Sequence, residues 1–114
     1  MKTFKFAING IKTAFSSEKN LKTHLAIALL VLIAGWYLEL SMMEWMLLIF
    51  CIGTVISMEL LNTAIEYFVD FYSPEIHPQA GKIKDIAAGA VLVVALMSVA
   101  IGLIIFIPKI AALI

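Results

Sequence analysis

The sequence predicts an all-helical membrane protein with one domain, in which an N-terminal amphipathic surface helix precedes three transmembrane helices. Of the 114 residues, 63% are hydrophobic and only 14% are charged. Soluble domains use roughly 45–50% apolar and about 25% charged residues, so a water-soluble globule is excluded. Three long apolar segments follow a lysine-containing N-terminus. Each of them can cross a bilayer as a helix.

Residues 1–20 form the predicted surface helix. Phe4, Ile8, Ile11 and Phe15 follow one another at spacings of four, three and four residues, with polar residues between them. This spacing is typical of an amphipathic helix that lies on a membrane surface. A cleaved signal peptide is a poor alternative, because the lysines continue beyond the segment and no small-residue cleavage site follows. A soluble partner for the apolar stripe remains an alternative.

The apolar runs define three membrane helices, which we expect at residues 21–38, 45–70 and 85–107. The third is the clearest, because residues 86–107 carry no charge and a crossing needs about 20 residues. The first reaches full length when Leu21 and the aliphatic stem of Lys22 are included. The second continues beyond Glu59, because the apolar pattern resumes directly after it.

The distribution of lysines predicts how the chain is oriented. Five of the eight lysines lie before or at the beginning of the first span, and Lys82 and Lys84 lie in the expected loop 71–84, whereas the turn 39–44 has none. Lysines remain on the cytoplasmic side of membranes. The N-terminus and the loop 71–84 should therefore be cytoplasmic and the C-terminus outside. Lys109 does not fit this orientation, because it lies near the C-terminus, on the side that is predicted to be outside.

Charge and cysteine content exclude several classes of function. Eight lysines balance eight acidic residues, so the chain lacks the basic surplus of a nucleic-acid-binding protein. The single cysteine, Cys51, excludes an internal disulfide and a cysteine-rich metal site. The chain also lacks the glycine-rich phosphate loops of soluble kinases and nucleotide-binding folds.

Four polar residues form a ladder on the second predicted span. Glu59, Asn62, Glu66 and Asp70 are separated by three, four and four residues, which places them on one helix face. Ionisable residues at membrane depth are costly and mark functional sites by default. Three carboxylates on one face repel one another unless a cation lies among them, and Mg²⁺ prefers such ligands. A solvated helix end is an alternative reading, strongest for Asp70.

Cations for a phosphate group lie near the ladder. The segment KDIAAG, residues 84–89, is expected to begin the third span, where the amide groups and the helix dipole favour an anion. A lysine at such a place can also be only an orientation signal. His24 and His77 are isolated in the sequence, and we interpret each as a capping or interfacial residue.

These motifs together resemble a known family. The segments ELLNTAIEYFVD (59–70) and HPQAGKIKDIAAGAVLV (77–93) are similar to the signature of the bacterial membrane-integral diacylglycerol kinases and undecaprenol kinases. The N-terminal segments FKFAINGIK and SEKNLKTH also look like the family's surface helix and first-span entry. The resemblance implies a homotrimer in the cytoplasmic (inner) membrane of a bacterium. It would transfer the γ-phosphate of Mg-ATP to a membrane lipid alcohol, at subunit interfaces near the cytoplasmic face.

Position by position, the resemblance also implies residue roles. Glu59 matches the family's catalytic base, while Glu18 and Glu66 match its Mg²⁺ ligands. The chain has no arginine, so contacts made by an N-terminal arginine elsewhere in the family fall to Lys5 or Lys12. The residues that match the nucleotide site are Asn62, Glu66, Asp70, Glu75, Ile76, His77, Lys84 and Asp85.

Three hypotheses of function follow. The first is a lipid kinase, with undecaprenol as the expected substrate because His24, the His-Pro pair at His77 and the sequence AAGAVL resemble the undecaprenol kinase branch. Diacylglycerol is the alternative substrate. The second hypothesis is a small oligomeric transporter subunit that uses Glu59 as a proton carrier. The third is a membrane assembly factor without chemistry.

Overall fold

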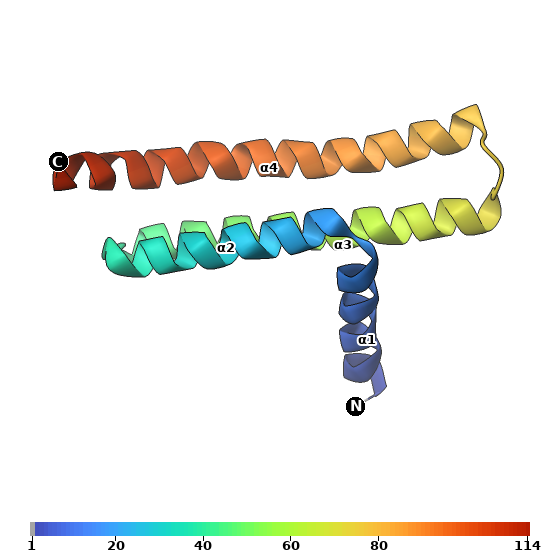
Figure 1. The fold of residues 1–114 in the computed structure, drawn as a ribbon, viewed down its shortest axis with the longest axis horizontal. Coiled ribbons are helices and arrows are strands. Elements are labelled where there is room, and N and C mark those ends of the chain that lie inside the picture. Colours follow the sequence, from blue (N-terminus) through green and yellow to red (C-terminus); the bar gives the residue numbers. More distant parts are fainter. Residues whose placement is uncertain (1) are drawn as a thin grey trace.

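The structure is a computed structural model that describes residues 2–114, and within this range every regular element is a helix. Figure 1 shows a short helix standing across a bundle of three long ones. The expected all-helical class is confirmed. The helices are α1 (Lys2–Ser17), α2 (Lys19–Tyr37), α3 (Met42–Tyr72) and α4 (Pro78–Leu113).

Three helices are long and apolar enough to cross a membrane: α2, α3 and α4. At about 1.5 Å per residue, the 19 residues of α2 extend about 28 Å, which matches a hydrocarbon core of about 30 Å. The 31 residues of α3 and the 36 of α4 are longer than one crossing requires. Both extend beyond the start of α2 at the same end of the bundle (Figure 1).

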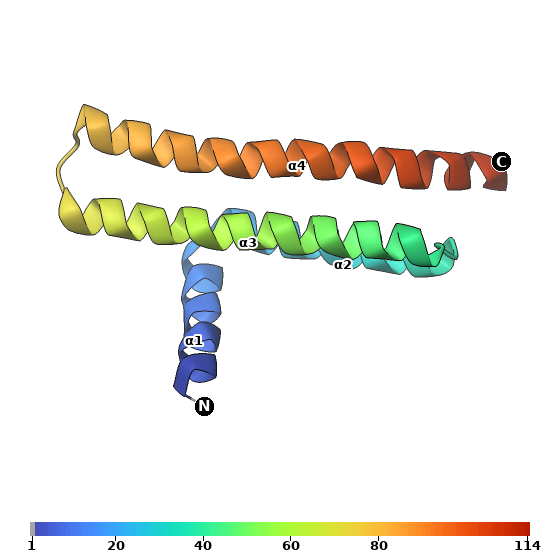
Figure 2. The same cartoon turned by 180° about the vertical axis from the view of Figure 1, so that it is seen from behind.

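The α1 helix meets the bundle almost at a right angle, at the point where α2 begins (Figures 1 and 2). Of its residues, Ala14 is buried, whereas Phe4 and Ile11 remain exposed. The ammonium group of Lys22 lies 5.5 Å from the ring centre of Phe15, a cation–π distance that ties the two helices together. A helix that stands across the long helices in this way would be able to lie along a membrane surface, with its apolar residues available to lipid.

A tight turn joins α2 to α3. The hydroxyl of Ser41 accepts a hydrogen bond from the backbone N–H of Glu44, and the Glu44 carboxylate accepts one from the backbone N–H of Ser41. This reciprocal capping box begins α3 at Met42, three residues before the expected start. Gly35 lies close beneath the turn, where a Cβ atom would come within 2.9 Å of a methyl carbon of Leu40.

The start of α4 differs from the expectation. The helix begins at Pro78 and not at residue 85, because proline suits the first helical position and His77 caps it, with Nδ1 accepting a hydrogen bond from the N–H of Gln79 at 3.1 Å. The interpretation of His77 as a capping residue is confirmed. Lys84 consequently lies within the helix, so the prediction that KDIAAG forms the anion-binding N-terminus was wrong.

The α3 and α4 helices pack along one another through most of their length (Figure 2). Leu48 of α3 and Ile105 of α4 are buried together with Leu40 of the turn. An ion pair closes the same end of the bundle, with Lys109 Nζ 3.0 Å from Glu44 Oε1. The lysine that did not fit the expected orientation is thus paired with a carboxylate.

Candidate active site

The polar ladder lies on one face of α3 and becomes more exposed along the helix. Glu59 is only 1% exposed and Asn62 is 8% exposed, whereas Glu66 is half-buried and Asp70 is exposed. The hydroxyl of Thr63 donates a hydrogen bond to the backbone carbonyl of Glu59 at 2.9 Å, within the helix. The face therefore runs from the buried Glu59 to a water-accessible end.

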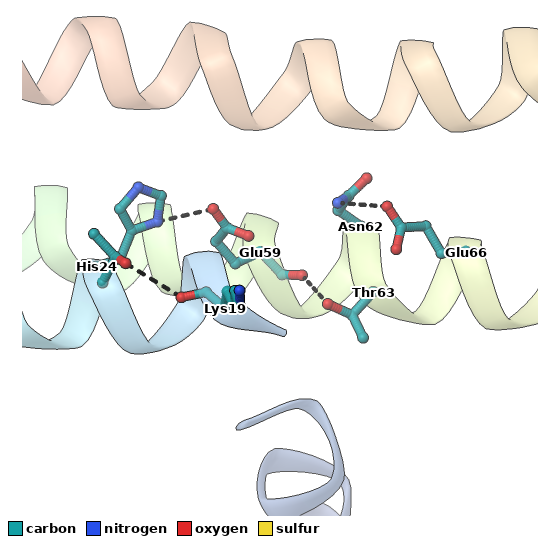
Figure 3. A network of polar contacts seen from close by, with 7 residues as sticks. Lys19, His24, Glu59, Asn62, Thr63 and Glu66 are labelled. Atoms are coloured by element: carbon teal, nitrogen blue, oxygen red, sulfur yellow. Dashed lines mark hydrogen bonds and ion pairs between the residues drawn. The ribbon is translucent and has the colours of Figure 1, made fainter. Parts of the chain in front are cut away.

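The buried carboxylate of Glu59 faces a histidine from another helix. His24 Nδ1 of α2 lies 2.8 Å from Glu59 Oε1, and Figure 3 shows the imidazole directed at the carboxylate. Neither atom has a further hydrogen-bond partner within residues 2–114. The sequence interpretation of His24 as a capping or interfacial residue missed this contact, because the two residues are far apart in the chain.

Asn62, the next residue of the ladder, has a hydrogen-bond acceptor without a partner in the described part of the chain. Asn62 Nδ2 donates a long hydrogen bond of 3.4 Å to Glu66 Oε1 (Figure 3). The amide oxygen of Asn62 is buried and has no partner in the described part of the chain. A buried polar atom without a partner costs free energy, so a ligand that donates a hydrogen bond there would be stabilised.

Glu18 contributes a third carboxylate from the connection between α1 and α2. It occupies the N-cap position of α2, but its side chain makes no capping hydrogen bond. The negative charges of Glu18 and Glu66 both act on Glu59. Such mutual repulsion is relieved when a cation lies among the carboxylates, so this donor set suits Mg²⁺.

Residues 2–114 do not contain a complete set of protein ligands for a metal ion. Among residues 2–114, no three side chains of His, Cys, Asp or Glu come together closely enough to hold a metal ion. Mg²⁺ commonly uses only one or two protein carboxylates together with water and substrate phosphates. Glu18 and Glu66 are therefore candidate ligands whose coordination of a metal would have to be completed by water and nucleotide phosphates.

A second group of the expected residues surrounds a pocket of about 170 Å³ at the α3–α4 loop. An ion pair between Lys84 Nζ and Asp70 Oδ1 joins the two helices beside it. Asp85, in contrast, is exposed and does not line the pocket. The lining residues are Asp70, Ser73, Pro74, Glu75, Ile76, His77, Ala80, Gly81 and Lys84.

The chain thus brings the expected site residues into two groups and not into one cavity. Glu59 and Asp70 are eleven residues apart, which corresponds to about 16 Å along α3. A larger hollow, about 450 Å³, lies at the opposite end of the bundle among Trp36, Tyr37, Glu39 and Trp45. Three of its four residues are aromatic, and the hollow is remote from the carboxylates of the ladder.

Comparison with known proteins decides the family. The model of the prokaryotic diacylglycerol kinases matches residues 5–106. The chain belongs to the prokaryotic diacylglycerol kinase family. It is 49% identical to an undecaprenol kinase of Bacillus subtilis over 108 residues, which cover 95% of this chain and 88% of that protein.

More distant relatives of this kinase carry a different name. A diacylglycerol kinase of Helicobacter pylori (strain J99) is 35% identical over 88 residues, covering 77% of this chain and 69% of the relative. One from Escherichia coli (strain K12) is 33% identical over 95 residues, covering 82% and 77%. The expectation of an ATP-dependent lipid kinase is confirmed. The transporter hypothesis finds no support.

Proposed function

We propose that this lipid kinase transfers the γ-phosphate of Mg-ATP to undecaprenol at the cytoplasmic face of the inner membrane. The observation that carries the proposal is the position of Glu59, a buried carboxylate near the membrane interface, beside a water-accessible acidic face. The name of the Bacillus subtilis relative supports undecaprenol as the substrate. Diacylglycerol, named for the other two relatives, is the alternative.

The depth of Glu59 follows from its contact with α2. His24 is five residues beyond the first residue of α2, so Glu59 lies about 8 Å inside the level where this helix begins. The surface helix α1 meets the bundle at the same level (Figure 1). A hydroxyl at the head of a membrane lipid would reach this depth while its chains remain among the apolar helices.

The proposed chemistry begins with Glu59 as the general base. Its carboxylate takes the proton of the lipid hydroxyl as the oxygen forms a bond to the γ-phosphorus, and the bond from that phosphorus to the bridging oxygen of ADP breaks. Mg²⁺, held by Glu18 and Glu66, would neutralise phosphate charge. The amide oxygen of Asn62, which has no partner within residues 2–114, would accept a hydrogen bond from a ligand bound between Glu59 and Glu66.

The pocket at the α3–α4 loop is the proposed place for the rest of the nucleotide. Lys84 supplies the positive charge for phosphate, and Asp70 holds its ammonium group in place. Asp85 follows Lys84 on the outer surface of α4, where it can contact a nucleotide only from outside the pocket. The loop residues Glu75, Ile76 and His77 form the remaining wall.

We also propose that the working unit is a homotrimer. The pocket at the α3–α4 loop, at about 170 Å³, is smaller than the roughly 300–1,000 Å³ of typical ligand pockets. Long apolar side chains such as Leu96 and Ile104 on α4 are exposed in the single chain. A neighbouring subunit against α3 and α4 would cover such side chains and complete the site.

A panel of lipid alcohols tests the proposed substrate. The purified protein in mixed micelles, supplied with labelled ATP and Mg²⁺, should phosphorylate undecaprenol with a higher kcat/KM than diacylglycerol. A clear preference for diacylglycerol would overturn the choice of substrate. Absence of transfer to every lipid alcohol in the panel would overturn the kinase itself.

A further inference from the structure

We infer that His24 is a positioning residue for the base Glu59, an inference that rests on the proposed function. Its imidazole Nδ1 lies 2.8 Å from Glu59 Oε1, and the contact joins α2 to α3 across the bundle (Figure 3). Neither atom has another partner within residues 2–114. Each of the two atoms therefore has the other as its one polar side-chain contact within the described residues.

The distance requires a proton between the two atoms. An unprotonated imidazole nitrogen and a carboxylate oxygen would repel each other at 2.8 Å, since both are acceptors. With the proton on the imidazole, His24 Nδ1 donates to Glu59 Oε1 and fixes which ring nitrogen carries hydrogen. No hydrogen bond within the described residues involves the other oxygen, Oε2, so Oε2 is the atom left for the lipid hydroxyl.

Burial makes this orientation effective. The side chain of Glu59 is 2% exposed, whereas that of His24 is 26% exposed. Within the described residues, the contact with His24 is the one polar side-chain contact of a carboxylate enclosed to this degree, so this contact sets the orientation of the carboxylate. Glu18 and Glu66, the other charged groups whose fields act on it, are negative and push it away from themselves. His24 is the one group within residues 2–114 whose contribution attracts the Glu59 carboxylate.

A purely structural role would have a different signature. If the contact only tied α2 to α3, its loss would lower stability and leave turnover by folded protein unchanged. Leu21 provides the matched control, because it is 1% exposed on the same helix, three residues before His24, and has no polar group. Leu21→Ala removes a buried α2 contact of comparable depth without altering hydrogen bonding at Glu59.

Steady-state kinetics of the full-length protein in undecaprenol mixed micelles test the inference. His24→Ala should lower kcat by about 10- to 100-fold, the range typical for a partner that orients a functional group, and leave the KM for ATP unchanged. His24→Asn should restore most of kcat, because its amide nitrogen is bonded to Cγ, as Nδ1 is in histidine. Leu21→Ala should lose thermal stability and keep kcat per folded molecule.

Two results would overturn the inference and leave the proposed kinase intact. One is His24→Ala with the kcat of the wild type. The other is a loss of kcat that His24→Asn does not restore and that Leu21→Ala reproduces at equal thermal stability. Full activity of Glu59→Gln would instead remove the base itself, and with it both the proposed mechanism and the role of His24.

Discussion

Lys84 on α4 and Asp70 on α3 form an ion pair in the wall of the pocket at the α3–α4 loop. The aspartate continues the acidic face of α3, while the lysine is the only cation among the residues that line this pocket in the described chain, leaving aside His77. The pair therefore places the one strong positive charge of the pocket at the end of a row of carboxylates. This relationship predicts a division of roles between the two residues.

Lys84→Met should lower kcat/KM for ATP by about 100-fold or more, because one charged contact that stabilises a transferring phosphoryl group contributes roughly 3–4 kcal/mol. Asp70→Asn should have a smaller effect, since the lysine remains. ATP titrations at saturating lipid measure both. Equal losses in the two variants would show that the pair acts as a structural tie and not through the lysine charge.

Glu66 should control the requirement for metal. Replacing it with Gln removes a negative charge from the expected Mg²⁺ site and should raise the Mg²⁺ concentration that gives half-maximal activity, at constant ATP. The matched control is Glu39→Gln, which removes an exposed charge at the opposite end of the bundle. An unchanged Mg²⁺ dependence in Glu66→Gln would exclude this carboxylate as a ligand.

Disruption of the capping box at the turn between α2 and α3 should lower the stability of the protein. Ser41→Ala removes the hydroxyl that accepts from the Glu44 N–H, and should lower the free energy of unfolding by about 1 kcal/mol. Lys109→Met should cost less, because its pair with Glu44 is partly exposed and such pairs contribute little to stability. Thermal unfolding in detergent measures both, and lipid phosphorylation at low temperature should be unchanged.

Substitutions at two glycines, Gly35 and Gly102, distinguish helix packing within one chain from packing between subunits. A Cβ atom at Gly35 would come within 2.9 Å of Leu40 and 3.0 Å of Trp45, so Gly35→Leu should destabilise the monomer. Gly102 has open space around it in the single chain. Gly102→Leu should therefore leave the helices intact but weaken the homotrimer.

Cross-linking and size-exclusion chromatography in detergent measure the assembly of these glycine variants. A stable trimer of Gly102→Leu would show that this face of α4 does not contact a neighbour. A wild-type protein that runs as a monomer while active would overturn the homotrimer itself.

The helical repeat predicted those features that depend on local sequence. The spacing of Glu59, Asn62, Glu66 and Asp70 sets their common face, because a helix repeats every 3.6 residues whatever surrounds it. The length of the apolar runs likewise predicted three helices able to span a membrane. Both are properties of single segments.

Contacts between helices could not be predicted in this way. His24 meets Glu59 only because α2 and α3 pack antiparallel in a particular register, and nothing near either residue in the sequence signals the other. The same is true of Lys109 and Glu44. The early start of α4 has a local signal in Pro78, which favours the first helical position, but proline is equally typical of the loop predicted for residues 71–84.

The most direct test of the account is the rate of a single turnover by Glu59→Gln. With enzyme in excess of labelled ATP, saturating Mg²⁺ and undecaprenol, the wild type should phosphorylate the lipid rapidly. The variant should bind ATP with unchanged affinity and transfer phosphate about 10²- to 10⁴-fold more slowly, as expected for loss of a general base. Transfer at the wild-type rate would contradict the assignment of Glu59 as the base.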